Sequence, residues 1–191
     1  LMNLGGIRVA VPATPEDAKG LMKSCIRSDS PSFFLEAGGR GGEMGYVPDG
    51  DYVTPWGQAA VRCRGGDVTV VAIGSMVKLA MVAAEVLRNE HSIHVEVIDP
   101  RTTSPLDRGA ILASIAKTGR LVVLDESDPY CGMASEITAL AATEAFSSLK
   151  AAPAKITPPH TPVPSTPHLE QLWLPSLERI ESTIRATVGT K

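Results

Sequence analysis

Two carboxylates follow one of the apolar runs of the sequence, at a place where they could do chemistry. Asp125 and Glu126 come directly after residues 120–124, and paired acids at the end of a strand can serve as general acid and base. An acidic turn that faces solvent or a partner chain explains the same pair. We favour the acidic turn, because a position in a fold does not by itself give a function.

A second charged group follows the apolar run at 93–98. Arg101 could hold a carboxylate of a partner chain through two parallel hydrogen bonds, with Asp99 and Asp107 beside it. The alternative is an internal ion pair, with Asp107 as the N-cap of the next helix. We favour the internal ion pair and keep Asp99 and Arg101 as candidate interface residues.

The histidines and cysteines indicate no metal or nucleophile site. None of them has the spacing of zinc ligands. Cys131 has no base nearby in sequence, so a buried or inert thiol is expected rather than a nucleophile. Glu136 is predicted one turn into the following helix. His160 and His168 bracket a proline-rich segment, 157–168, and His160 and Glu136 are further interface candidates.

Five residues rich in glycine, 38–42, follow a predicted strand and therefore suggest a phosphate-binding loop. Such a loop needs a helix N-terminus directly after the glycines, and no Gly-Lys-Ser/Thr sequence is present. Tyr46-Val-Pro-Asp-Gly50 follows instead. We interpret the segment as part of a linker over residues 38–66.

The elements that must position these residues alternate between strands and helices. Apolar runs at 68–73, 93–98 and 120–124 predict strands. A further short strand is predicted at 154–156, after the helical pattern at 133–149. This alternation indicates right-handed crossovers and a mostly parallel sheet with helices on both faces. The run at 93–98 alternates, which suggests one more polar face. Helices are predicted at 76–88, 107–117, 133–149, 169–173 and 175–188.

The first 37 residues form an incomplete unit. A strand at 7–11, a helix from Thr14 to about Arg27 and a strand at 32–36 cannot enclose a core of their own. Thr14 is the predicted N-cap, followed by proline and two acids. We expect this segment to be the remnant of a domain whose front part lies upstream.

Composition narrows the class of protein. The net charge of −3 supports neither a nucleic-acid partner nor a polybasic membrane surface, and no apolar run approaches the ~20 residues of a membrane span. Three scattered cysteines fit a reduced, cytoplasmic protein.

Eight segments in register carry a family resemblance. The chain resembles the β subunit of the thiamine-diphosphate-dependent 2-oxo acid dehydrogenases, the pyruvate, branched-chain and acetoin group. The matching segments are Pro12-x-x-Pro15-Glu-Asp-Ala-Lys-Gly20-Leu21, Pro31-x-x-Phe34-Leu-Glu36, Gly42-Glu43-x-Gly-x-Val-Pro48, Gly66-Asp-Val-Thr-Val-Val71, Val97-Ile-Asp-Pro-Arg101-Thr-x-x-Pro105-Leu-Asp107, Thr118-Gly-Arg-Leu-Val-Val123, Gly132-x-x-x-Glu136-Ile137 and Pro162-Val-Pro164-x-x-Pro167-x-Leu169-Glu170.

The resemblance implies a domain plan and a set of partners. Residues 1–37 would be the remnant of an N-terminal pyrimidine-binding domain, and 67–191 a three-layer α/β domain like the C-terminal domain of transketolase. The fragment would contact an α subunit, a second β subunit and the dihydrolipoyl acyltransferase core. In this family the end of the sheet that carries Asp125 and Glu126 faces a subunit interface.

The resemblance places the chemistry outside this sequence. The family's catalytic β residues would lie upstream of Leu1, and the α subunit would hold thiamine diphosphate and Mg²⁺. We therefore expect no catalytic and no cofactor-binding residue in the fragment, and no turnover by it alone. A potassium site of some relatives would use Cys25, Ile26, Ser28 and Ser30; the two serines stand where acid and amide ligands are usual, so this K⁺ site should be weak or missing.

Two other classes of function stay open. One is a stand-alone α/β module that binds a small anion or nucleotide in the crevice at the strand ends. The other is a different transketolase-like thiamine enzyme that acts on sugars. The proline-rich segment followed by Leu169 and Glu170 favours the dehydrogenase group.

Overall fold

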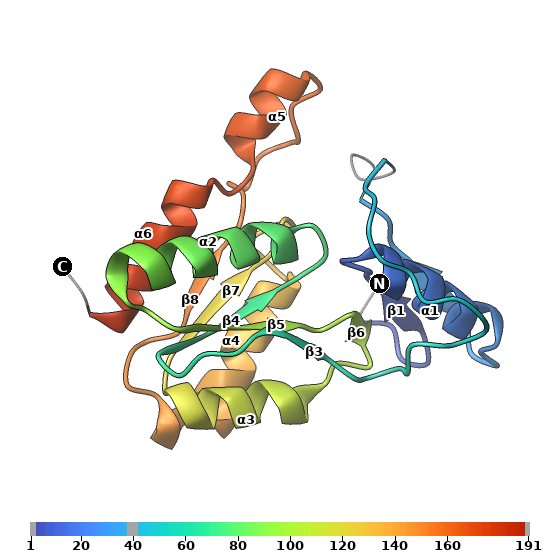
Figure 1. Cartoon of the computed structure of the whole chain (residues 1–191), viewed down its shortest axis with the longest axis horizontal. Coiled ribbons are helices and arrows are strands. Elements are labelled where there is room, and N and C mark those ends of the chain that lie inside the picture. The colour runs from blue at the N-terminus through green and yellow to red at the C-terminus, as the bar shows by residue number, and fades with distance from the viewer. Residues whose placement is uncertain (1–2, 38–41, 190–191) are drawn as a thin grey trace.

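The strands form two sheets in residues 3–37 and 42–189, which the computed structural model describes (Figure 1). The smaller has the order β2-β1-β6 and the larger the order β3-β5-β4-β7-β8. Their strands are β1 (Arg8–Ala10), β2 (Ser32–Phe34), β3 (Ala60–Cys63), β4 (Val68–Ala72), β5 (Val95–Asp99), β6 (Thr102–Ser104), β7 (Leu121–Leu124) and β8 (Ala154–Ile156).

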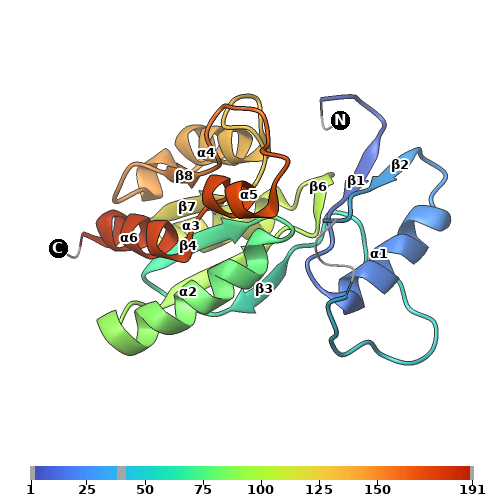
Figure 2. The ribbon, with the colours of Figure 1, turned by 90° about the horizontal axis from the view of Figure 1, so that it is seen from above.

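Helices cover both faces of the larger sheet, as predicted (Figures 1 and 2). One face packs on α2 and α6, the other on α3 and α4. The helices are α1 (Pro15–Ile26), α2 (Met76–His91), α3 (Arg108–Thr118), α4 (Met133–Glu144), α5 (Pro167–Trp173) and α6 (Leu177–Val188), with a short 3₁₀ turn η2 (Phe146–Ser148) after α4.

Strand β4 lies at the centre of the larger sheet. It pairs in parallel with β5 and β7, and β7 pairs in parallel with β8. Both of its faces are covered, and all five of its residues are buried. This explains the continuous apolar sequence of the strand, because a parallel sheet with helices on both faces leaves no polar side. The predicted mostly parallel α/β architecture is confirmed.

Strand β5 corrects one detail of the sequence analysis. Its alternating polar positions do not form a solvated face, because all five residues are buried. Glu96 accepts hydrogen bonds from Ser114, at 2.7 Å, and from Lys117 on α3. Burial raises the pKa of Glu96, but the bonds from Lys117 and Ser114 outweigh it and hold the pKa below its ordinary value. The alternation therefore marks buried polar pairing.

Two short strands were not predicted. β3 lies within the segment interpreted as a linker and pairs antiparallel with β5, at the edge of the larger sheet. β6 pairs antiparallel with β1 and so joins the first unit to the second. β6 contains no apolar residue and β3 has an arginine inside it, so neither shows the apolar run that predicted the other strands. The domain boundaries at 37 and 66 stay predictions, and residues 38–41 of the glycine-rich segment lie outside the described ranges.

Helix ends follow the capping residues of the sequence. The Asp17 N–H donates to Thr14 Oγ1 at the start of α1, and the Ala110 N–H donates to Asp107 Oδ1 at the start of α3, so both predicted caps are confirmed. α4 is shorter than the predicted 133–149, because it ends at Glu144 before η2. α5 stands away from the body of the molecule in Figure 1 and buries none of its residues.

Two adjacent glycines in the loop after β3 test how closely this loop approaches the start of β5. A Cβ at Gly65 would lie 2.3 Å from the backbone oxygen of His94, whereas a Cβ at Gly66 meets nothing within 4 Å. We expect Gly65→Ala to lower the free energy of unfolding by about 1–3 kcal/mol, the cost typical of overpacking. Gly66→Ala is the matched control in urea denaturation. Equal stability of the two variants would contradict the close approach.

Candidate functional site

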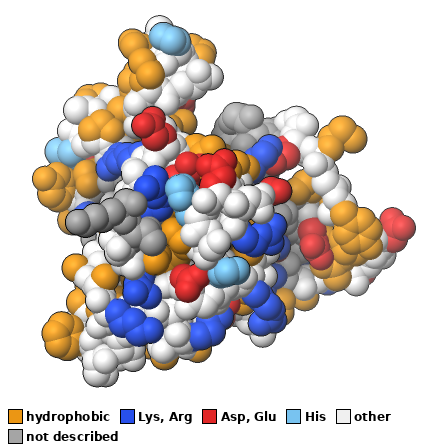
Figure 3. Space-filling model, turned by 60° about the vertical axis from the view of Figure 1, so that its left-hand side comes forward, with side chains coloured by type: hydrophobic (Ala, Val, Ile, Leu, Met, Phe, Trp, Pro, Cys, Tyr) orange, Lys and Arg blue, Asp and Glu red, His pale blue; other side chains and the backbone are white. Residues whose placement is uncertain are grey.

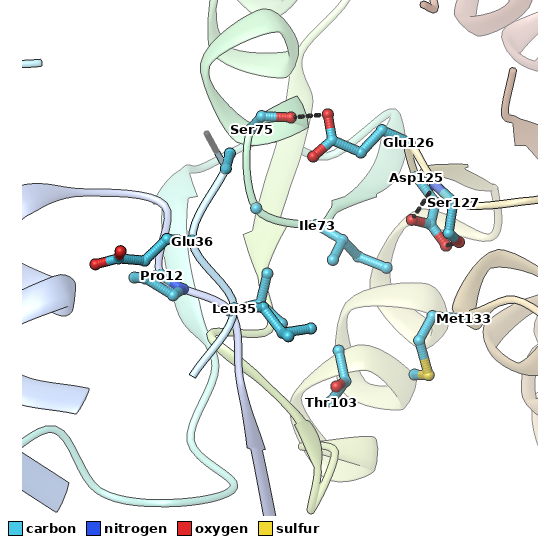
Figure 4. Close-up of a pocket in the computed structure, with 13 residues that line it drawn as sticks. Pro12, Leu35, Glu36, Ile73, Ser75, Thr103, Asp125, Glu126, Ser127 and Met133 are labelled. Carbon is cyan, nitrogen blue, oxygen red and sulfur yellow. Dashed lines mark hydrogen bonds between the residues drawn. The ribbon is translucent and has the colours of Figure 1, made fainter. Parts of the chain in front are cut away.

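A pocket of about 330 Å³ lies where the carboxyl ends of β4 and β7 meet the first unit of the chain (Figure 4). Ile73, Gly74 and Ser75 after β4 and residues 125–127 after β7 form one side. Val11 and residues 35–37 of the first unit form the other. The predicted acids Asp125 and Glu126 therefore line a cavity that is enclosed by residues next to strands of both sheets.

Asp125 is a structural cap. It is 3% exposed, and its carboxylate accepts hydrogen bonds from the Ser127 N–H (3.0 Å), the Ser127 hydroxyl (2.5 Å) and the Ala134 N–H (3.2 Å). Ala134 lies in the first turn of α4, where backbone N–H groups lack partners within the helix. This side chain therefore stabilises the start of α4, and for Asp125 the burial corrects the interpretation of an acidic turn that faces solvent or a partner chain.

Glu126 reaches across the crevice to the start of α2. It accepts a 2.5 Å hydrogen bond from the hydroxyl of Ser75, the residue that precedes the first turn of α2 (Figure 4). A negative charge near a helix N-terminus is favourable. Glu126 therefore takes the place where an anionic ligand would sit, and this opposes the small-anion or nucleotide module considered from the sequence.

A buried charge cluster joins the two units next to this pocket. Arg62 of β3 donates to Asp99 at the end of β5, at 2.7 Å, and forms an ion pair with Asp17 of α1. Arg101 Nη1 lies 3.5 Å from Asp17 Oδ1. Sequence analysis missed Arg62 and Asp17, because they are far from Asp99 in sequence and only the unpredicted β3 brings them together.

Asp99, Arg101 and Asp107, which the sequence predicts to lie together, all have hydrogen-bond partners within this chain. The Arg101 N–H donates to Asp99 Oδ1 at 3.0 Å, and its guanidinium donates to the Gln58 carbonyl at 2.8 Å. Asp107 caps α3 and also accepts from the Ala59 N–H, at 2.8 Å. This agrees with the internal ion pair, and a contact of Asp99 or Arg101 with another subunit stays a prediction.

His160 ties the proline-rich segment to the loop after β7. Its Nδ1 lies 2.6 Å from Asp128 Oδ2, and its ring stacks edge-on against Tyr130 at 4.9 Å. The Tyr130 N–H and then His160 lower the pKa of Asp128. Glu136 lies in the first turn of α4, as predicted, and is exposed. Cys131, just before α4, is exposed and not buried. The interface roles of His160 and Glu136 stay predictions.

The turn after α1 is closed by hydrogen bonds of its own. The Ser28 hydroxyl donates to the Ser30 carbonyl at 3.0 Å, and the Ser28 N–H donates to the Cys25 carbonyl at 3.2 Å. These oxygens are engaged within the turn, and neither serine adds the negative charge that hard cations prefer. The weak potassium site at Cys25, Ile26, Ser28 and Ser30 stays a prediction. Over the described ranges, no three His, Cys, Asp or Glu side chains form a group that could hold a metal ion.

Charges of both signs share the face shown in Figure 3. Lys and Arg side chains gather on its lower part, and Asp and Glu side chains gather above them. This mixture agrees with the net charge of −3. No helix among the described residues is long and apolar enough to cross a bilayer.

Residues 57–180 match the family of the transketolase C-terminal domain. The chain belongs to this family. The match begins just before β3 and ends within α6, so it covers the larger sheet, its helices and β6. The resemblance found in the sequence motifs is confirmed.

Several curated proteins that are similar to this chain are β subunits. It is 44% identical over 186 residues to the acetoin:2,6-dichlorophenolindophenol oxidoreductase subunit beta of Cupriavidus necator, a match that covers 97% of this chain and 55% of the relative. The subunit of the same name in Bacillus subtilis is 42% identical, over 98% of the chain and 54% of the relative. The pyruvate dehydrogenase E1 component subunit beta of Rickettsia felis is 40% identical, over 90% and 52%. The chain spans about half the length of these relatives.

Solved structures confirm the fold. A split-gene transketolase, described as an inactive β4 tetramer, superposes with a TM-score of 0.77 at 22% identity and covers all of this chain and 60% of that one. A transketolase of Pichia stipitis has a TM-score of 0.61 at 16% identity, over 96% and 25%. At these identities the likeness concerns the fold alone.

Burial of Asp99 makes stability depend on pH in a defined direction. Asp99 is fully buried, and loss of hydration raises its pKa to about 6 although Arg62 opposes the shift. The ordinary pKa is about 3.9, so between about pH 4 and 6 the folded chain keeps a proton that the unfolded chain has lost. The contribution of this group to stability therefore falls as the pH rises through that window.

Asp99→Asn cannot ionise and should lack this dependence. Between pH 4 and pH 7 we expect the raised pKa of Asp99 to cost the wild type roughly 2 kcal/mol in free energy of unfolding. The variant should not show this loss. Urea denaturation at a series of pH values measures the difference, and Asp49→Asn, at an exposed position, is the control. Parallel pH profiles of Asp99→Asn and the wild type would refute the raised pKa.

Proposed function

We propose that this chain is the C-terminal part of the β subunit of a thiamine-diphosphate-dependent 2-oxo acid dehydrogenase complex in the cytoplasm. The observation that carries the proposal is the identity of 44% over nearly the whole chain with a β subunit. The geometry agrees with a role other than chemistry, because Asp125 caps a helix and Glu126 is bound to Ser75.

The function of the fragment would be assembly. We infer contacts with an α subunit, with a second β subunit and with the dihydrolipoyl acyltransferase core. α5 and the proline-rich segment before it support this inference. Leu172 is 73% exposed, and Leu169 and Val163 are more than half exposed on the same projecting part of the chain. Apolar side chains gathered on an exposed element are typical of protein–protein contacts.

Thiamine diphosphate and Mg²⁺ would belong to the complete enzyme. The cofactor supplies the carbanion chemistry when bound, and we place its binding residues on the α subunit and on parts of the β subunit outside this sequence. This chain would position the subunits around it.

Among the substrate branches, acetoin is the one we favour. The two acetoin oxidoreductase subunits match 97% and 98% of the chain at 44% and 42% identity, whereas the Rickettsia felis pyruvate dehydrogenase subunit matches 90% at 40%. Pyruvate and branched-chain 2-oxo acids are the competing substrates.

Reduction of 2,6-dichlorophenolindophenol with acetoin, pyruvate or a branched-chain 2-oxo acid tests the proposal. We expect no turnover by the 191-residue chain alone. The complete β subunit with its α subunit and thiamine diphosphate should turn over acetoin fastest. No turnover of any of these substrates by an associated, cofactor-loaded complex would refute the proposed activity.

The assembly role has its own test. Leu172→Asp should weaken association of the complete β subunit with its partners by about tenfold or more, because it puts a charge into an apolar contact. Phe146→Asp is the matched control, since Phe146 is 75% exposed on η2 and lies away from α5. Analytical ultracentrifugation reads out both. Equal association of the two variants would count against α5 as a contact.

A further inference from the structure

The pocket lies at the point of the larger sheet where chain connections change direction. α2 follows β4 and packs on one face, whereas α4 follows the neighbouring strand β7 and packs on the other. The loops after β4 and β7 therefore separate and leave a crevice between them. In open α/β sheets, crevices of this kind at the carboxyl ends of the strands are where ligands bind.

The first unit of the chain closes this crevice into a pocket. Leu35 faces Ile73 and Met133 across it (Figure 4), and Val11 also lines it. Its volume of about 330 Å³ is at the small end of the range for ligand pockets, about 300–1,000 Å³. The apolar walls would hold the hydrocarbon part of a small molecule.

The charged groups around the pocket all have the same sign. Asp125, Glu126 and Glu36 line it, and none of the described lining residues is a Lys, Arg or His. Asp125 already has three hydrogen-bond donors, but Glu126 is held by Ser75 through only one of its oxygens among the described contacts. Figure 4 shows the Glu36 carboxylate pointing away from the cavity, so the free oxygen of Glu126 is the one available to a positively charged group.

A polar side chain without a partner lies at the far end of the pocket from Glu126. Thr103 is 7% exposed, and its buried Oγ1 has no hydrogen-bond partner within the described part of the structure. Figure 4 places Glu126 and Ser75 at one end of the pocket and Thr103 at the other. An unpaired buried hydroxyl is costly, and a polar atom of a ligand could satisfy it.

We propose that this pocket binds a small organic amine. The ammonium group lies against Glu126, the hydrocarbon part lies between Leu35, Ile73 and Met133, and a hydroxyl at the other end of the molecule meets Thr103. This inference does not rest on the proposed function, because the site is built entirely from this chain. Its test uses no α subunit and no turnover, so failure of one proposal leaves the other standing.

The probe is 4-(aminomethyl)cyclohexanol, titrated into the isotope-labelled chain and followed by backbone amide NMR. We expect shifts at Gly74, Ser75, Thr103 and Ser127. The neutral isostere 4-(hydroxymethyl)cyclohexanol should bind more weakly, and 4-hydroxycyclohexanecarboxylate should not bind. Glu126→Gln should weaken amine binding by about tenfold, because it removes a charged partner and keeps the acceptor for Ser75. Glu144→Gln, at an exposed position on α4, should leave the affinity unchanged.

Three results would overturn the proposal: tighter binding of the carboxylate than of the amine, unchanged affinity of Glu126→Gln, or shifts confined to other parts of the chain. Leu35→Trp keeps the test valid where Glu126→Gln does not fold. Leu35 is 41% exposed at the pocket, so a larger side chain there fills the cavity without disturbing the core. The variant should lose the shifts at Gly74 and Ser75, and retained binding would also contradict the site.

Discussion

The ion pairs of Arg62 fix how the two units of this chain lie against each other. One guanidinium meets a carboxylate of α1 and a carboxylate at the end of β5, and the two acids are 2% and 0% exposed. A buried charge is tolerated only when it is paired and hydrogen-bonded, so removing one partner is far more harmful than the pair itself is stabilising. The pocket has walls from both units, and its shape therefore depends on this cluster and on the pairing of β1 with β6.

The sequence predicted the elements whose pattern is local. β4 and β7 follow from continuous apolar runs, and the starts of α1 and α3 follow from the caps Thr14 and Asp107. β3 and β6 could not be found this way, because neither has a continuous apolar run and each pairs with a strand distant in sequence. The polar positions of β5 show the same limit, since their partners on α3 are a property of packing.

The candidate site was predictable in part. Asp125 and Glu126 could be placed at a strand end from the sequence, but the burial of Asp125 against the start of α4 could not be predicted. Their neighbours could not be placed, because Leu35 and Val11 come from the first unit and meet the strand ends only through the tertiary fold. Arg62 was missed for a similar reason: an arginine in a presumed linker has no pattern that distinguishes a buried ion pair from a solvated side chain.

The pairing of β1 with β6 also constrains how this fold can be divided in evolution. The matched family region begins at residue 57, yet β6, within that region, finds its only described strand partner in β1, upstream of it. A gene fusion that moved residues 57–180 alone would carry an unpaired strand edge, and the partly buried Arg62 would lack its partner Asp17. The module that could be exchanged between proteins as a stable piece therefore includes the strand and helix before the family boundary.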